Sequence, residues 1–297
     1  MTPLNKNTPA AIYTQLLDWI ELIKFEHTVF ALPFALSGFI LASNGIPNIA
    51  KLIWTIIAFT GARTAAMSLN RVIDADIDAV NPRTKLRAIP QGKIKKNKAI
   101  LLAIISFLVM LLAASQLPPL CMVLSPIAIV WLSLYSYSKR ATPLCHLVLG
   151  IALGGAALGG WIAAGGNLAS VTIWFLAAAV ACWVAGFDII YACQDQDFDV
   201  KEKIFSIPAK YGIDSALKIS KLLHLITVIC LIYVGLSGQL GLIYWLGVTI
   251  ISAMLIYEHS LVSASDLSKV NAAFFTTNGI VSILAFVCIL VDHLSRN

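Results

Sequence analysis

The chain has 297 residues, of which 59% are hydrophobic and only 12% are charged. Soluble domains carry about 25% charged residues, so this composition excludes an ordinary soluble domain, and the mean hydropathy of +0.85 indicates a membrane protein. The net charge of +6 does not indicate nucleic-acid binding, because no soluble domain is present to display the basic residues.

The first predicted element is an amphipathic lead-in over residues 1–20. It lacks the apolar core and cleavage site of a signal peptide, and Tyr13, Leu16, Leu17 and Ile20 would share one face.

A membrane-spanning helix needs about 20 mostly apolar residues, and nine stretches meet this requirement. They are 24–44, 52–70, 98–115, 119–137, 144–165, 171–193, 217–237, 240–257 and 271–292. The sequence therefore predicts an all-α integral membrane protein with nine transmembrane helices, forming a single domain over residues 1–297.

The basic residues predict the orientation of these spans. Of 21 Lys and Arg, 18 lie in the N-terminal segment and in the loops after the second, fourth, sixth and eighth spans. Positive residues stay on the cytoplasmic side. We therefore expect a multi-pass protein of the cell inner membrane, with its N-terminus and its long polar loops facing the cytoplasm.

The first acidic cluster ends the second span. Asn70, Asp74 and Asp78 are spaced four residues apart, so they line one face of a helix. Arg63 lies seven residues before Asn70 on the same face. Asp76 lies off this face, which is typical of a solvated residue.

The second acidic cluster ends the sixth span. Asp188, Asp195 and Asp199 share a face with Tyr191 or Ala192. Asp197 lies off this face and is also expected in solvent.

Carboxylates stacked in this way repel one another unless a cation neutralises them. Oxygen ligands suit Mg²⁺, which is held by one or two carboxylates together with phosphate oxygens and water. Basic loops follow both clusters, and their Arg and Lys side chains can hold phosphate oxygens. The alternative, solvated helix ends, explains any single Asp but explains two aligned clusters poorly. The sequence predicts a site for a Mg²⁺-bound diphosphate.

Arg63 and Asp188 lie about two turns deeper, within the apolar spans. Charges at this depth face a cavity or a partner. The two residues could pair with each other. Alternatively, Arg63 receives an anionic substrate group while Asp188 polarises or deprotonates a hydroxyl. The five histidines show no ligand spacing, so we expect structural or interfacial roles for them.

These motifs resemble those of the UbiA superfamily of intramembrane aromatic prenyltransferases. Asn70-x-x-x-Asp74-x-x-x-Asp78 and Asp195-x-x-x-Asp199 resemble its two Asp-rich motifs. Two further segments also resemble the family's pattern: Arg83-Thr84 with Arg87 and Ile89-Pro90-x-Gly92, and Tyr135-Ser-Tyr137-Ser-Lys139-Arg140.

The chain departs from the family pattern at two places: Arg71 follows Asn70, and Ala88-Ile89 stand where Pro-Leu is common. The Asn-Arg form, with the segment 25–33, resembles a branch related to 4-hydroxybenzoate prenyltransferases. Part of that branch acts on a dihydroxynaphthoate in menaquinone synthesis.

The resemblance implies a helical bundle around a central cavity, open sideways to membrane lipid. It implies Mg²⁺-dependent transfer of a polyprenyl group from polyprenyl diphosphate to an aromatic acid, 4-hydroxybenzoate in ubiquinone synthesis. The alternatives are 1,4-dihydroxy-6-naphthoate as acceptor or, outside the enzymes, a secondary transporter of an organic anion.

The implied roles fall into three groups. The metal ligands would be Asn70, Asp74, Asp78, Asp195 and Asp199. The catalytic residues would be Arg63, Asp188 and Asp195. The substrate would be bound by Arg63 and Asn70 at the acceptor carboxylate, by Arg83, Lys139, Arg140 and Lys203 at the leaving diphosphate, and by Tyr137 or Tyr191 beside the cation.

Overall fold

The computed structural model describes residues 9–43 and 45–296, with the side chains of residues 9–12, 25–27, 29 and 30 excepted. Over this range the chain is helical and contains no named strand. The elements in chain order are α1 (Pro9–Ile23), α2 (Phe25–Ala42), α3 (Ile49–Ile73), α4 (Ala75–Val80), α5 (Lys96–Ala114), α6 (Pro119–Leu134), η1 (Tyr135–Arg140), α7 (Cys145–Ala164), α8 (Val171–Ala192), η2 (Cys193–Asp195), α9 (Gln196–Lys201), α10 (Ile207–Tyr211), α11 (Ile213–Ser237), α12 (Leu242–Ser260), η3 (Ala272–Thr277) and α13 (Asn278–Arg296).

The all-α membrane fold is confirmed. Among the described residues, eight helical segments are long and apolar enough to cross a membrane, and Ala31–Ala42 within α2 is a shorter apolar helix. The count of nine spans therefore stays a prediction. The exposed face of α5 consists of aliphatic side chains such as Leu101, Leu108 and Leu112, as expected of a surface in contact with lipid.

The predicted amphipathic lead-in corresponds to α1, as far as the structure describes it; residues 1–8 lie outside the described range. Tyr13, Leu16, Leu17 and Ile20 are exposed on this helix. The buried guanidinium of Arg71 donates to the Leu22 carbonyl at 3.3 Å and so ties α1 to α3.

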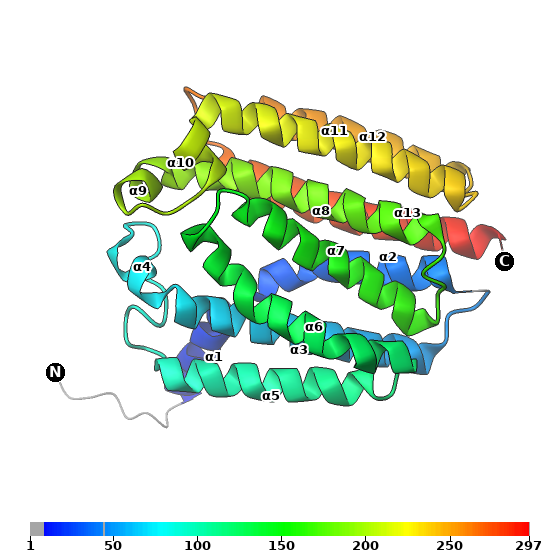
Figure 1. The fold of residues 1–297 in the computed structure, drawn as a ribbon, viewed down its shortest axis with the longest axis horizontal. Coiled ribbons are helices and arrows are strands. Elements are labelled where there is room, and N and C mark those ends of the chain that lie inside the picture. Colours follow the sequence, from blue (N-terminus) through cyan, green and yellow to red (C-terminus); the bar gives the residue numbers. More distant parts are fainter. Residues whose placement is uncertain (1–8, 44, 297) are drawn as a thin grey trace.

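The long helices run side by side, and the short polar elements gather at one end of the bundle. Figure 1 shows α4, α9 and α10 together at that end, whereas α13 finishes at the opposite end. The helix pairs α3–α5, α2–α7, α7–α8 and α8–α11 pack against each other. This arrangement brings the ends of α3 and α8, which carry the two acidic clusters, to the same end of the molecule.

Close packing in the middle of the bundle depends on glycines of α7. A Cβ at Gly160 would lie 1.8 Å from the Ala35 carbonyl oxygen of α2, so only glycine fits there. A Cβ at Gly155 on the same helix would meet nothing within 4 Å. Small residues at such contacts let membrane helices approach closely, where van der Waals packing holds them together.

The α12–α13 hairpin is fastened at both ends by buried polar contacts. At one end Asn278 donates to Glu258, which is 0% exposed, at 2.9 Å. At the other end the Asp292 carboxylate accepts from the backbone nitrogens of Gly241 (2.8 Å) and Tyr244 (3.3 Å), which are otherwise unpaired donors at the start of α12. The two helices are thereby held in one register.

We expect Gly160→Ala to destabilise the protein by about 1–3 kcal/mol, the usual cost of overpacking, because its methyl group would push α2 away from α7. Gly155→Ala, on the same helix, should change stability by less than about 0.5 kcal/mol. Thermal unfolding of the purified proteins in one detergent measures the difference. Equal stability of the two variants would contradict this account of the α2–α7 contact.

Candidate functional site

A polar cavity of about 310 Å³ opens at the end of the bundle that carries the acidic clusters. Its wall is built from α2, α3, α4, η1, α7, α8, η2, α9, η3 and the loops that follow α4 and α9. Both predicted clusters contribute to this wall. The predicted residues that line it are Arg63, Asn70, Asp74, Asp78, Arg83, Lys139, Asp188, Tyr191, Asp195 and Asp199.

The first cluster keeps its helical register although α3 ends at Ile73. The backbone nitrogen of Asp74 donates to the Asn70 carbonyl at 2.9 Å, and that of Asp78 donates to the Asp74 carbonyl at 2.8 Å. Asp74 is only 2% exposed. The i, i+4 spacing therefore places all three side chains on the cavity wall, as predicted.

Asp74 is balanced by cations from η1. Its carboxylate lies 2.7 Å from Lys139 Nζ and 3.2 Å from Arg140 Nη1, and it accepts a hydrogen bond from Asn70 at 3.0 Å. Asn70 also donates to Ser136 Oγ at 3.1 Å. The Lys139-Arg140 segment thus lies over the first cluster, 65 residues away in sequence.

The second cluster crosses a change in helix type, because α8 ends at Ala192 and a 3₁₀ turn carries Asp195 before α9 begins. Arg83 donates two hydrogen bonds to the Asp195 carboxylate, from Nε at 2.9 Å and from Nη2 at 2.5 Å. Its third nitrogen, Nη1, donates to Tyr191 Oη at 2.9 Å. Burial disfavours the charge on Arg83, but the hydrogen bonds and attraction of Asp195 outweigh this, so the pKa of Arg83 lies above its ordinary value.

Two more contacts hold the remaining acids of the clusters. Arg87 Nη1 contacts both oxygens of Asp78, at 2.7 and 2.8 Å. Asp199 accepts from Ser206 Oγ at 2.8 Å. Spacing alone did not identify Ser136 or Ser206 as supports of the site, since an isolated serine carries no sequence signal of its contacts.

Asp76 and Asp197 are both exposed, as their positions off the two faces predicted. The side chain of Asp76 is 90% exposed and pairs with Lys96 at 2.8 Å. Its hydrogen bond with Lys96 holds the pKa of Asp76 below its ordinary value. Neither residue lines the cavity.

Arg63 and Asp188 do not pair with each other. The Arg63 Nε atom is buried and has no hydrogen-bond partner among the described residues. Asp188 instead lies 2.7 Å from Nδ1 of His146. His146 lines the cavity beside Asp188, a position that the spacing of the five histidines did not predict.

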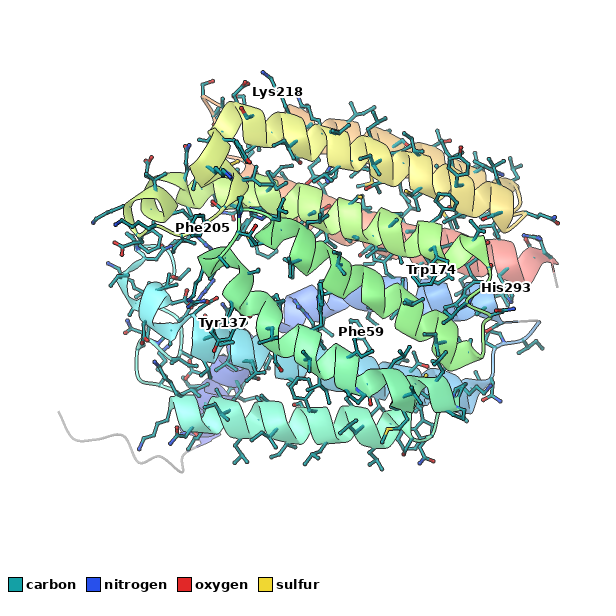
Figure 2. All side chains as sticks on the ribbon, viewed as in Figure 1. Phe59, Tyr137, Trp174, Phe205, Lys218 and His293 are labelled. Carbon is teal, nitrogen blue, oxygen red and sulfur yellow. The ribbon has the colours of Figure 1, made fainter. Side chains whose placement is uncertain are left out.

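Arg63 also borders a second cavity, of about 450 Å³. Arg63, Tyr135, Leu149 and Leu153 line both cavities, so the two meet at these side chains. The second cavity is walled by apolar residues of α3, α5, α6 and α7, including Phe59, which is labelled in Figure 2. A polar chamber and an apolar chamber thus border the same four side chains.

Three predicted binding residues are not on the wall of the polar cavity: Tyr137, Arg140 and Lys203. Arg140 lies behind Asp74 and donates to the Ile73 carbonyl at 2.8 Å. Tyr137, labelled in Figure 2, is half exposed and lies under Arg140, 5.6 Å from the guanidinium carbon. Lys203 is exposed at a left-handed turn (φ 56°).

The donors around the cavity are carboxylate oxygens with one amide, the set that Mg²⁺ prefers. Within the described part of the chain, no three His, Cys, Asp or Glu side chains stand close enough to hold a metal ion by themselves. The set therefore fits an ion that completes its shell with phosphate oxygens and water, rather than one held by a cage of side chains.

Fold and site together define a multi-pass membrane protein built to hold an amphiphile with an anionic head. The chain matches the UbiA prenyltransferase family over residues 31–280. The chain belongs to the UbiA prenyltransferase family, whose members transfer prenyl groups.

Curated relatives include the 4-hydroxybenzoate octaprenyltransferase of Vibrio vulnificus, which is 30% identical over 83% of this chain and 86% of its own length. The enzyme of the same name from Photobacterium profundum is 29% identical over 94% of this chain and 97% of its own length.

Solved structures share the fold. A UbiA homologue from Aeropyrum pernix superposes with a TM-score of 0.83 at 34% identity, covering 90% of this chain and 98% of that one. A homologue from Archaeoglobus fulgidus, solved with DMAPP and Mg²⁺, gives a TM-score of 0.75 at 21% identity, covering 94% of this chain and 100% of that one.

We expect Arg83→Lys to weaken the binding of Mg²⁺-diphosphate by roughly tenfold, because an ammonium group cannot hold Asp195 with a fork and contact Tyr191 at the same time. Calorimetric titration of the purified protein measures this affinity. Lys85→Ala, an exposed neighbour outside the cavity, is the matched control. Unchanged affinity in Arg83→Lys would show that the fork is dispensable.

Proposed function

We propose that this protein transfers a polyprenyl group from a polyprenyl diphosphate to the ring of 4-hydroxybenzoate and releases diphosphate. The observation that carries the proposal is the junction at Arg63, where the polar cavity meets the apolar one. A diphosphate head fits the first chamber and an isoprenoid tail the second. The names of the curated relatives support the choice of acceptor.

In this proposal Asn70, Asp74, Asp78, Asp195 and Asp199 hold Mg²⁺ together with the diphosphate. The metal supplies neutralisation of the negative charge that grows on the departing group. Lys139 and Arg83 already form ion pairs with Asp74 and Asp195. Their positive groups would also attract the phosphate oxygens. Arg140 supports Asp74 from behind, and Lys203 and Tyr137, which lie off the cavity wall, have no assigned role.

The acceptor would lie between Arg63 and Asp188. The Arg63 side chain lines the cavity and carries a buried Nε without a partner in the described part of the chain. Its guanidinium would donate to the acceptor carboxylate, which would lower the cost of burying this cation. Asp188 faces the hydroxyl and raises electron density on the ring. The carbon–oxygen bond of the prenyl diphosphate breaks with its electrons on diphosphate, a ring carbon bonds to the allylic carbon, and the ring then loses a proton. Apolar walls exclude water that would quench the cation.

We also propose that residues 1–297 form one domain in the cell inner membrane, with the cavity mouth and the N-terminus on the cytoplasmic side. The charge distribution of the loops supports this orientation. The substrates on this reading are polyprenyl diphosphate and an aromatic acid, with no nucleic acid involved.

A membrane-fraction assay with Mg²⁺ and a polyprenyl diphosphate tests the proposal, using 4-hydroxybenzoate and 1,4-dihydroxy-6-naphthoate as alternative acceptors. Prenylated benzoate is the expected product. Prenylated naphthoate alone would move the protein to menaquinone synthesis, and diphosphate binding without either product would reject both acceptors.

Asp74→Asn and Asp195→Asn should each lower turnover by at least about 100-fold, because each removes a charge that neutralises the metal–diphosphate complex. Asp76→Asn and Asp197→Asn are matched controls, since they make the same change two residues away on the exposed side. Initial rates in the same membrane fraction give the comparison, and equal losses in all four variants would argue against the assigned faces.

Filling the apolar cavity should shorten the isoprenoid that the enzyme accepts. Gly159 of α7 lines this cavity, and a Cβ there meets nothing within 4 Å. Gly159→Phe should lower kcat/KM for a long polyprenyl diphosphate by roughly tenfold, the effect of losing about two buried methylenes, while geranyl diphosphate is used as before. Equal loss with both donors would place the tail elsewhere.

A further inference from the structure

A buried histidine connects the two sides of the polar cavity. His146, the second residue of α7, is 3% exposed. Its Nδ1 lies 2.7 Å from Oδ2 of Asp188 on α8, and its Nε2 lies 3.3 Å from the backbone nitrogen of Ile207 at the start of α10. The partners are 42 and 61 residues away in sequence, so a pattern search along the chain does not connect them.

The second contact determines which ring nitrogen carries the proton. The backbone nitrogen of Ile207 can only donate, so Nε2 of His146 accepts and bears no proton. The proton of the neutral imidazole is then on Nδ1, which donates to Asp188 Oδ2. The backbone of α10 therefore fixes the tautomer that keeps Asp188 hydrogen-bonded.

This hydrogen bond leaves the two oxygens of Asp188 inequivalent. Oδ2 is held by His146, whereas Oδ1 has no hydrogen-bond partner in the described ranges. The side chain is 26% exposed and lines the cavity. One oxygen is thus fixed and the other is available to a ligand in the chamber.

The imidazole of His146 also contacts the segment that supports the second acidic cluster. Ile207 follows Ser206, which donates to Asp199 Oδ2 at 2.8 Å and accepts from the backbone nitrogen of Ala209 at 3.2 Å. His146 is therefore bonded on one side to Asp188 and on the other to the segment that orients Asp199.

We propose that His146 is a positioning residue that orients Asp188, so that Asp188 Oδ1 receives the hydroxyl proton of the aromatic acceptor. This inference rests on the proposed function. As the ring carbon attacks the allylic carbon, the O–H bond breaks, its electrons stay with the ring system and the proton moves to Oδ1. When the ring C–H proton leaves to solvent, the proton on Asp188 returns to the acceptor oxygen, and His146 keeps its own proton throughout.

Orientation matters because a proton acceptor must lie within hydrogen-bond reach of the proton that it receives. A carboxylate held at one oxygen by a buried donor loses most of its freedom to rotate. The backbone nitrogen of Ile207 fixes the imidazole ring that supplies this constraint.

Two substitutions separate the contacts of His146. The amide nitrogen of Asn can occupy the place of Nδ1 and donate to Asp188, but Asn is too short to reach Ile207. The amide oxygen of Gln can occupy the place of Nε2 and accept from Ile207. His146→Leu, of similar size, removes both contacts.

The experiment measures acceptor kinetics, Mg²⁺-diphosphate binding and thermal stability of the full-length protein in lipid nanodiscs. His146→Leu should lower kcat/KM for the acceptor by about 100-fold, because Asp188 would lose the contribution that a general base usually makes to the rate. His146→Asn should recover most of that loss. His146→Gln should recover stability but not acceptor kinetics. Because it keeps the contact with Ile207, its diphosphate affinity should stay within about threefold of wild type.

A double-mutant cycle with Asp188→Asn separates positioning from a general structural effect. If His146 acts through Asp188, then adding His146→Gln to Asp188→Asn should cost no more than about twofold further. The two single variants of this cycle, His146→Gln and Asp188→Asn, each carry a side-chain amide at the altered position. The cycle therefore stays informative even if His146→Leu does not fold.

Wild-type acceptor kinetics in His146→Gln, or multiplicative losses in the double variant, would overturn the inference while the proposed function stands. A wild-type protein that binds diphosphate but prenylates neither acceptor would overturn the proposed function and this inference with it.

Discussion

Carboxylates at the end of a membrane bundle need compensating charges or donors, because burying an unpaired anion costs several kcal/mol. Here the compensation comes from distant parts of the chain. Asp74 is paired with Lys139 and Arg140 of η1, and Asp195 with Arg83 from the loop after α4. The first pairing joins the end of α3 to η1, and the second joins η2 to the loop after α4. The ion pairs that balance the charges therefore also determine the shape of the chamber.

The pairing also prepares the chamber for an anionic ligand. Asp74, Asp78 and Asp195 each have a cationic partner, and Asp199 has a hydroxyl donor. A metal–diphosphate complex brings both signs of charge, and it can replace these internal contacts with equivalent ones. Under the proposed function, binding would be an exchange of partners, which costs less than creating new buried charges.

The sequence predicted those features that depend on local spacing. The span expected over 171–193 is found as Val171–Ala192. The acids at four-residue intervals fall on one wall because the helical hydrogen bonds run through Asp74. Asp76 and Asp197 point to solvent for the same geometric reason.

Features that depend on tertiary contacts could not be predicted in this way. His146 meets Asp188 only because α7 and α8 pack side by side, and no spacing rule reports such a contact. Lys203 looked equivalent to Arg83 as a basic residue after an acidic cluster, yet its left-handed backbone carries it outside the cavity.

The fastening of α12 to α13 at both ends has a mechanical consequence. The Asn278–Glu258 contact joins the two helices at one end, and Asp292 joins them at the other. The two helices are therefore fixed in one register. Phe274, just before α13, stacks on Tyr191 with ring centroids 4.1 Å apart. The α12–α13 hairpin therefore contributes, through Phe274, to the packing of an aromatic ring at the chamber wall.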